Sequence, residues 1–346
     1  TGLGEDARLA EAVAAFARDL PEGKFLPLAR RGNVVGALDM GLAPTLLPGR
    51  VSETSAHDIL EAEWGPLPEG LGRNATGILE GLRDGELNAL LLLGTDPIRD
   101  HPTPQLARQA LDNAELVVAF DQYLTDSSRL ADVVFPVVGF AEVEGTVTNI
   151  EGRVQKVNRL VPGPGQTRPA WSVLDDLARR MGGDLGAPSA AALAKEIERV
   201  APAYHGVTWD VLDWGEGREG LVLPLDAGVQ PLEYIPVDPN LAATSAEYGI
   251  HLGRVLYDDG VRTRMSPSLA ALAPPAMLYL NPEDAADLGL TVGDVASVEG
   301  DNGSVSLPVA LDPSLGRGTV YVPANLAATA DLGATVAVAI AAGEKL

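Results

Sequence analysis

The sequence predicts an α/β protein, in which an open, doubly wound and mostly parallel sheet is followed by a small β-barrel-like domain. Three observations carry this prediction. Short apolar runs alternate with amphipathic segments over the first half of the chain, which is the rhythm of strands alternating with helices. From about residue 246 onward, strand patterns separated by turn signals replace that rhythm. The 346 residues, 46% of them hydrophobic, suffice for about two domains with a sizeable core.

The first half of the chain carries the predicted sheet. Apolar residues recur at helical spacing over residues 5–20, and residues 89–93 form a continuous apolar run that stops at Gly94. A strand that is buried on both faces, as in a parallel sheet, has this pattern. The other predicted elements are a strand at 24–29, a Gly/Pro-punctuated loop at 36–50, helices at 75–86 and 102–114, strands at 115–121 and 132–138, and a helical turn at 125–131.

The middle of the chain is predicted to be less regular. Residues 156–170 contain a Pro/Gly-rich connection, and residues 171–200 are mostly helical in pattern. The domain limits predicted from these changes are an α/β domain at 1–185, an irregular linker at 186–245 and the barrel-like domain at 246–346.

Strand and turn signals predict the barrel. Asn281 is an expected N-cap, with Pro282 at the first position of a short helix. Residues 301–303, Asp-Asn-Gly, predict a hairpin turn. The predicted strands are 276–280, 294–300, 304–312, 318–323 and a buried strand within 333–343.

Composition excludes several classes of function. The formal charge is −23, from 25 basic and 48 acidic residues, so the surface repels nucleic acid and anionic lipid heads. The stretch has no cysteine and therefore no disulfide and no thiolate ligand for zinc or iron–sulfur clusters. No apolar run reaches the ~20 residues of a membrane helix. The histidines lack metal-ligand spacing and are expected to be surface or structural; they are His57, His101, His205 and His251.

Residues 131–155 hold three glutamates, Glu142, Glu144 and Glu151. Glutamates this close in sequence can form an acid/base pair, can bind a metal ion together, or can occupy turns at the surface. Acid/base work needs a desolvated glutamate of raised pKa, whereas the flanking Gly145 and Gly152 favour turns that are open to water. A role as solvated turn residues is the expectation.

The loops after the predicted strands are better placed for a ligand. In open α/β sheets, ligands bind beyond the carboxyl ends of the strands. Gly94, Asp96 and Pro97 follow one strand, and Asp121 ends the next. The two carboxylates can accept hydrogen bonds from a nucleotide base or ribose. The alternative is a capping and turn role. No phosphate-binding loop, dinucleotide glycine motif or nucleophile elbow is present, so nucleophilic catalysis has little support.

Several stretches together resemble the molybdopterin oxidoreductase superfamily. The stretch at residues 33–49, NVVGALDMGLAPTLLPG, resembles more narrowly the large iron–sulfur subunit of the NADH-quinone oxidoreductases, also called respiratory complex I. The stretches that carry the resemblance are 32–51, 90–97, 120–155, 257–269 and 281–325.

The resemblance implies a fold and a division of labour. It implies that the chain is cut from a longer polypeptide, whose N-terminal region holds iron–sulfur clusters, and that a double-psi β-barrel ends the chain. In molybdoenzymes this fold holds molybdopterin guanine dinucleotide, whereas in complex I subunits it is a scaffold. The match places Gly94, Asp96, Pro97 and Asp121 in the nucleotide-contacting loops.

The barrel loops depart from the pattern of the molybdoenzymes. LGR at residues 252–254 and RTR at 262–264 stand where TGR and TRT are frequent, and the histidine expected after the strand of Tyr321 is absent. These departures predict a vestigial dinucleotide site. The scaffold role that the resemblance implies gives this segment no catalytic residue and no cofactor. No metal-binding residue is expected, because cysteine is absent and the histidines lack ligand spacing.

The first functional expectation is therefore a scaffold segment of the iron–sulfur electron-transfer subunit of a proton-translocating NADH:quinone oxidoreductase. It would lie peripherally on the cytoplasmic side of the bacterial inner membrane, without insertion, and contact other subunits of the peripheral arm but no nucleic acid. One alternative is the C-terminal part of a molybdenum or tungsten oxidoreductase such as a formate dehydrogenase. Another is a stand-alone binding module.

Overall fold

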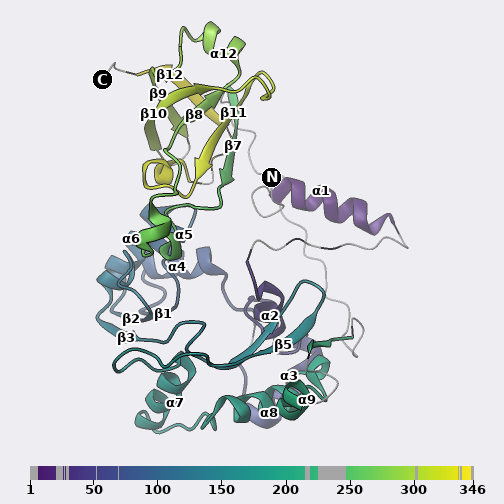
Figure 1. Cartoon of the computed structure of the whole chain (residues 1–346). Coiled ribbons are helices and arrows are strands. Elements are labelled where there is room, and N and C mark those ends of the chain that lie inside the picture. Colours follow the sequence, from purple (N-terminus) through teal and green to yellow (C-terminus); the bar gives the residue numbers. More distant parts are fainter. Residues whose placement is uncertain are drawn as a thin grey trace. The chain divides into compact units, whose positions relative to one another are not determined.

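The structure is a computed structural model, and its helices and strands are labelled in Figure 1. The chain divides into two compact units. Unit 1 comprises Thr1–Pro21, Leu79–Val134 and Pro236–Leu346, and unit 2 comprises Glu22–Ile78 and Phe135–Ile235. The residues described are 7–20, 26, 28, 31–51, 53–68, 70–214, 219–224, 247–300, 303–333, 335 and 337–343. The strand predicted at 24–29 falls largely outside them. A parallel sheet and a closed barrel confirm the predicted fold class. The predicted domain limits stay predictions.

The α/β part of unit 1 is built on a sheet with the strand order β1-β2-β3. β1 (Ala89–Leu93) and β2 (Leu116–Asp121) are parallel, in the register Leu93↔Phe120. The other elements that lie wholly in this part are α5 (Pro97–Asp100), α6 (Pro104–Asn113) and the 3-10 turn η1 (Ser128–Leu130). Two further elements, β3 (Val133–Pro136) and α4 (Ala75–Arg83), contain residues of both units. The helix predicted at the start of the chain is α1 (Ala7–Arg18). Apart from α5, for which no helix was predicted, these elements lie where the sequence predicts them, within a few residues.

The prediction that the strand at 89–93 is buried on both faces is wrong. Leu90 and Leu92 are buried, but Leu91 and Leu93 are 54% and 55% exposed. β1 is an edge strand of its sheet, with β2 as its neighbour. An edge strand whose second face is uncovered alternates in burial, and the leucine run hides this alternation in the sequence.

Unit 2 contains an antiparallel sheet with helices around it, and its strand order is β4-β5-β6. The strands are β4 (Gly145–Thr148), β5 (Arg153–Val157) and β6 (Leu221–Val222). The helices are α2 (Val34–Asp39), α3 (Glu53–Trp64), α7 (Ala170–Arg180), α8 (Ala190–Val200) and α9 (Trp209–Trp214). The predicted loop at 36–50 therefore begins as a helix, and α3 was not predicted, because its apolar residues form no clear stripe.

The core of unit 2 shows that the predicted linker is more regular than expected. α8 lies where residues 171–200 were predicted to be helical, but α9 and β6 lie in the later stretch for which no element was predicted. Side chains from this stretch pack on β5. The buried members of this cluster are Val154, Ala201, Tyr204, Val207, Leu212 and Leu223. Proline and glycine between these short elements obscure their apolar pattern in the sequence.

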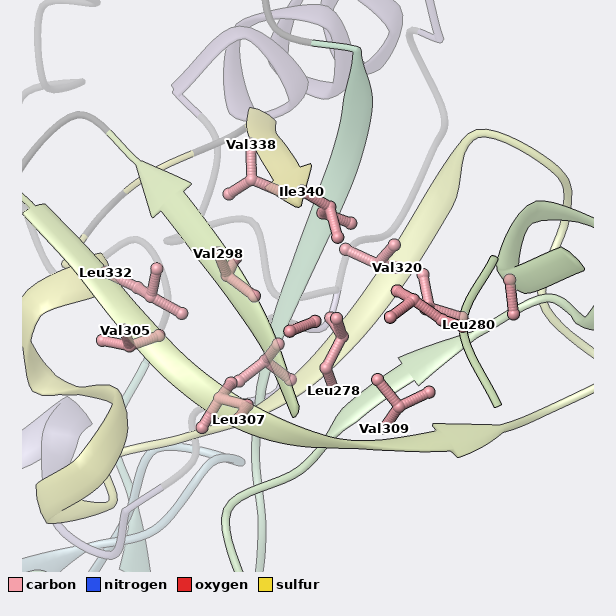
Figure 2. Packing of buried hydrophobic residues seen from close by; sticks show 14 residues of the cluster. Leu278, Leu280, Val298, Val305, Leu307, Val309, Val320, Leu332, Val338 and Ile340 are labelled. Carbon is pink, nitrogen blue, oxygen red and sulfur yellow. The ribbon is translucent and has the colours of Figure 1, made fainter. Parts of the chain in front are cut away.

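The second part of unit 1 is a closed barrel with the strand order β10-β8-β11-β7-β12-β9. The strands are β7 (Tyr248–Arg254), β8 (Leu278–Leu280), β9 (Val295–Gly300), β10 (Gly303–Leu311), β11 (Thr319–Ala324) and β12 (Ala337–Ala342). Alternate side chains fill the interior, as Figure 2 shows for Leu278, Val298 and Leu307, all 1% exposed or less. Burial of these side chains is the main stabilising term of the barrel.

The predicted helix cap in the barrel is confirmed. The Asn281 side chain accepts a hydrogen bond from the backbone N–H of Glu283 at 2.9 Å, and Pro282 begins α12 (Pro282–Asp287). The amide group of Asn281 also donates to the carbonyl of Leu315 at 2.7 Å. The side chain therefore joins the start of α12 to the loop before β11.

Replacing Asn281 by alanine removes both hydrogen bonds. We expect a loss of about 1–2 kcal/mol in the free energy of unfolding, because an N-cap and one further hydrogen bond are lost. Urea unfolding measures this loss. Asn281→Asp keeps the cap and loses only the bond to Leu315, so it should cost less; an equal cost for both variants would contradict the capping role.

Candidate functional site

The two predicted loops lie side by side at the carboxyl ends of β1 and β2. The backbone N–H of Gly94 donates to the carbonyl of Phe120 at 2.9 Å, which extends the strand pairing to the end of β1. Gly94 has a φ of +60°, and a Cβ built on it would meet no atom within 4 Å. A left-handed glycine with open space beside it leaves bare backbone for a ligand to approach.

Asp96 is 1% exposed and joins these two loops. Its Oδ1 accepts hydrogen bonds from the hydroxyl of Ser127 at 2.6 Å and from the backbone N–H of Ser127 at 3.1 Å. Its Oδ2 is buried and has no hydrogen-bond partner. A buried carboxylate oxygen without a donor is costly, and such an atom requires an explanation.

The capping alternative does not account for Asp96. It occupies the N-cap position of α5, but its side chain makes no capping hydrogen bond. The hydroxyl of Ser127 caps instead, accepting from the backbone N–H of Ile98 at 3.0 Å. Pro97 is the first residue of α5 and plays the usual structural role of a proline at that position.

Asp121 is bonded within its own turn. Its Oδ1 accepts from the backbone N–H of Gln122 at 2.8 Å, and its Oδ2 accepts from the hydroxyl of Thr125 at a long 3.3 Å. Burial raises the pKa of this carboxyl group, and the nearby charge of Asp96 adds to the rise. The turn role expected as the alternative therefore describes Asp121 well, although its charged form is poorly stabilised.

Two arginines complete the cluster. The Nε of Arg99, in α5, is 2.5 Å from the Oδ2 of Asp126. Arg264, at the end of α10 (Val261–Arg264), places its Nη1 3.3 Å from the same oxygen and its Nη2 3.8 Å from the Oδ2 of Asp96. The Nε of Arg264 is buried without a partner. The cluster thus places two arginines among the carboxylates of Asp96 and Asp126.

A third arginine lies at the barrel end of this site. The Nη2 of Arg254, the last residue of β7, is 3.9 Å from the Oδ1 of Asp100 in α5. The resemblance named the segments of Arg254 and Arg264, but sequence reasoning missed Arg99, Asp126 and Ser127 as members of the site. An arginine three residues after Asp96 was the only signal for Arg99.

Asp121 and Asp126 are expected to respond to pH in opposite directions. Burial raises the pKa of Asp126. The hydrogen bond from Arg99 and the charges of Arg99 and Arg264 together lower this pKa by more, so the net pKa lies below the ordinary range. Wild type should therefore gain stability relative to Asp126→Asn as the pH rises through about 4, because the folded state binds fewer protons there. For Asp121 the folded pKa is raised, so wild type should lose stability relative to Asp121→Asn over the same range. Urea unfolding between about pH 3 and 6 measures both differences, and a shared sign would contradict the assignments.

The glutamates of residues 131–155 do not form a carboxylate pair at this site. Glu151 is exposed beside Arg153, and Gly152 forms the turn between β4 and β5 with a φ of +77°. Glu142 accepts from the backbone N–H of Gly139 at 2.7 Å. Asp132 is structural, since its carboxylate accepts from the backbone N–H of Val117.

Glu142 also lines a separate cavity of about 530 Å³ in unit 2. The Nε1 of Trp171, which lines the same cavity, is buried without a hydrogen-bond partner. The residues around the cavity are Val138, Glu142, Val143, Glu144, Arg159, Gly163, Gly165, Thr167, Pro169 and Trp171. Among the described residues no group of three potential metal ligands occurs.

Comparison with known proteins gives two family matches. The Molybdopterin oxidoreductase family matches residues 10–180, and the Molydopterin dinucleotide binding domain matches residues 254–343. By overall fold, the chain is similar to the acetylene hydratase from Pelobacter acetylenicus, with a TM-score of 0.54, 20% sequence identity, and coverage of 82% of this chain and 45% of that one. At this identity the likeness concerns the fold.

Curated relatives belong to several kinds of oxidoreductase. The NADPH-Fe(3+) oxidoreductase subunit alpha of Geobacter sulfurreducens is 31% identical, covering 88% of this chain and 34% of the relative. An NADH-quinone oxidoreductase subunit of Rhizobium meliloti is 28% identical, covering 85% and 34%. The F420-dependent formate dehydrogenase 1 subunit alpha of Methanococcus maripaludis is 29% identical, covering 88% and 48%. The chain therefore spans between about a third and a half of the length of these relatives.

One expectation is corrected by these matches. The altered barrel loops predicted a vestigial dinucleotide site, but residues 254–343, which include RTR and the last residue of LGR, match a molybdopterin dinucleotide binding domain. LGR and RTR therefore do not support doubt about the dinucleotide. The resemblance to the superfamily is confirmed, whereas the NADH-quinone oxidoreductase subunit is one of several kinds of relative.

Proposed function

Because this chain belongs to the molybdopterin oxidoreductase family, we propose that it is the part of a longer oxidoreductase polypeptide that holds a molybdopterin dinucleotide. One observation carries the proposal. Two buried polar atoms, the Oδ2 of Asp96 and the Nε of Arg264, lack hydrogen-bond partners beyond the carboxyl end of a parallel strand. Ligands of open α/β sheets bind at such ends, and a dinucleotide offers groups that suit both atoms.

The residues of the site fit molybdopterin guanine dinucleotide. Guanine carries N–H donors, which suit the unpaired oxygen of Asp96, and acceptor oxygens and nitrogens that suit arginine. The pyrophosphate is an anion, and arginine binds phosphate oxygens well. Asp96 would hold the guanine, Arg264 and Arg254 would hold the anionic groups, and Gly94 would leave room for close approach. When bound, the group supplies the redox chemistry, through a molybdenum or tungsten centre.

None of these residues needs to react in this proposal. Asp96, Arg254 and Arg264 would bind and orient the dinucleotide. Such division of labour is general for cofactor enzymes, in which the protein supplies position and electrostatics. Electrons would enter and leave through the rest of the polypeptide.

A second candidate is the scaffold of an NADH:quinone oxidoreductase. The relative from Rhizobium meliloti favours it, as does the stretch at 33–49. In this case the iron–sulfur clusters would lie elsewhere in the polypeptide. The chain would then contact other subunits of the peripheral arm on the cytoplasmic side of the membrane, and its dinucleotide site would be empty. Among the described residues, no helix is both long and apolar enough to cross a membrane.

The metal and pterin content of the full-length protein decides between the two candidates. The protein is purified without oxygen, and molybdenum and tungsten are measured by elemental analysis together with the fluorescence of oxidised pterin. Stoichiometric metal and pterin are expected. Iron without molybdenum, tungsten or pterin would overturn the first proposal and support the scaffold.

A further inference from the structure

Arg264 is under-bonded for a partly buried arginine. A guanidinium group has five N–H donors in a fixed fork, and a good pairing with carboxylate is short and bidentate. The contacts of Arg264 are a single 3.3 Å hydrogen bond to Asp126 and a 3.8 Å approach to Asp96. Its Nε is buried without a hydrogen-bond partner, and the side chain as a whole is 26% exposed. The arginine is therefore shared between two acids and satisfied by neither.

Asp126, in contrast, has a firm partner in Arg99. The Nε–Oδ2 distance of 2.5 Å is much shorter than the distance to Arg264, and both side chains are about a quarter exposed. If Arg264 left, Asp126 would keep this ion pair. Of the two arginines, Arg264 is the one that can change partners at low cost.

Access to Asp96 also depends on Arg264. The Oδ2 of Asp96 is the acceptor that the proposed dinucleotide needs, yet it is buried beneath its neighbours, with Arg264 facing it. A ligand reaches this atom only if a neighbouring group moves. Arg264 faces this atom at 3.8 Å and is held less firmly than Arg99.

The C-terminal part of unit 1, which includes α10 and the barrel, is joined to the α/β part by polar links. Arg264 reaches Asp96 and Asp126, Arg254 reaches Asp100, and the amide of Gln105 donates to Asp331 at 2.8 Å. The hydrophobic cluster of the barrel, in contrast, is formed by barrel residues. The ion pairs among these links weaken as salt rises, because partly exposed charges are screened.

We propose that Arg264 is an ionic latch: without ligand it ties the α10 segment to Asp126 and Asp96, and an anionic dinucleotide opens it by replacing Asp126 as the partner of the guanidinium group. Asp126 is thus an internal anion that competes with the ligand. In this exchange Arg264 gives up its long contacts with Asp126 and Asp96. The ligand in turn provides partners for the Nε of Arg264 and the Oδ2 of Asp96, which lack them. The role of the ligand in this inference rests on the proposed function, whereas the latch itself does not.

Hydrogen exchange tests the latch without any ligand. Three backbone N–H groups report on α10: those of Thr263 and Arg264 donate to the carbonyl of Gly260, and that of Met265 donates to Val261. In the full-length protein, exchange of these amides should accelerate about three- to tenfold as NaCl rises from about 0.05 to 0.5 M. In Asp126→Asn it should be fast at low salt and insensitive to salt. Glu63→Gln, which breaks the exposed Arg199–Glu63 pair of 3.0 Å in unit 2, is the matched control.

Binding of GDP, the nucleoside diphosphate half of the dinucleotide, tests the competition. We use cofactor-free full-length protein and calorimetry. Asp126→Asn should bind GDP about three- to tenfold more tightly than wild type, because the competing charge is gone. Arg264→Gln should bind about tenfold more weakly, and Glu63→Gln should equal wild type. A purely structural role for the pair predicts weaker binding in both site variants.

The outcomes separate the latch from the proposed function. If neither salt nor Asp126→Asn changes the hydrogen-exchange rate of the amides at 263–265, the latch is overturned, whether or not GDP binds. Salt-sensitive exchange with no GDP binding in wild type overturns the competition and counts against the dinucleotide, but leaves the latch in place. Weaker GDP binding by Asp126→Asn also overturns the competition. Tighter binding by Asp126→Asn with weaker binding by Arg264→Gln supports both parts.

Discussion

Asp96→Ala is expected to lower the free energy of unfolding by about 2–4 kcal/mol and to abolish retention of the dinucleotide. The carboxylate is buried and accepts two hydrogen bonds from Ser127, one from the hydroxyl and one from the backbone N–H. Alanine leaves both donors without this acceptor in a buried place, and each unsatisfied group costs about 1–3 kcal/mol. Arg264 also loses one of its two acids. Urea unfolding of the full-length protein and its pterin content measure the two effects.

Two further variants separate the charge of Asp96 from its shape and provide a control. Asp96→Asn keeps the shape and one carbonyl oxygen for Ser127, so it should unfold more easily than wild type but less easily than Asp96→Ala, while still losing the charged acceptor that faces Arg264. Asp84→Asn alters a half-exposed carboxylate paired with Arg83 and should match wild type in both measurements. Normal pterin content in Asp96→Asn would show that the charge of Asp96 is not needed to hold the dinucleotide.

The candidate site was partly predictable because parallel strands end at one edge of a sheet. The apolar runs at 89–93 and 115–121 fixed the two strands, so Gly94, Asp96 and Asp121 were expected near each other. Their proximity to Arg264 was not, since that residue lies 138 positions from its partner Asp126. A short helix between two Pro/Gly-rich stretches has no pattern that reveals what it packs against. Charge pairing over such separations depends on the tertiary fold.

The same limit applies to the sheet. The sequence pattern identified β1 as a strand because five apolar residues precede Gly94. It gave no sign that one face is uncovered, since a leucine run has no alternation to read. The exposed Leu91 and Leu93 follow from the place of β1 at an edge, which is a property of the whole sheet.

The stretch at residues 33–49, which carried the narrower resemblance, has a structural role in unit 2. Asp39, at the end of α2, is 1% exposed. Its Oδ1 accepts from the Nε of Arg50 at 2.7 Å, and its Oδ2 accepts from the hydroxyl of Tyr204 at 2.9 Å. The hydroxyls of Tyr204 and Thr148 are 3.0 Å apart. One carboxylate therefore ties α2 to the following loop, to β4 and to the segment after α8.

This network explains two features that sequence patterns leave open. Arg50 has a φ of +58°, a conformation that costs energy in any residue other than glycine, and its ion pair with Asp39 holds it there. Tyr204 is buried, and its pKa is raised mainly by that burial, so its hydroxyl remains a donor at any ordinary pH. The link between Asp39 and Tyr204 spans 165 positions and has no local signature.

Asp39→Ala should therefore destabilise unit 2 by about 2–4 kcal/mol, because it leaves the buried hydroxyl of Tyr204 without its acceptor and Arg50 without its counter-charge. Tyr204→Phe removes only the hydroxyl and should cost about 1–2 kcal/mol. In a double-mutant cycle the two losses should fall short of additivity, since both variants delete the same hydrogen bond. Urea unfolding of the two single variants and the double variant measures this. Fully additive losses would mean that Asp39 acts through Arg50 alone, and that the αL conformation of the loop, rather than the link to Tyr204, is what the carboxylate maintains.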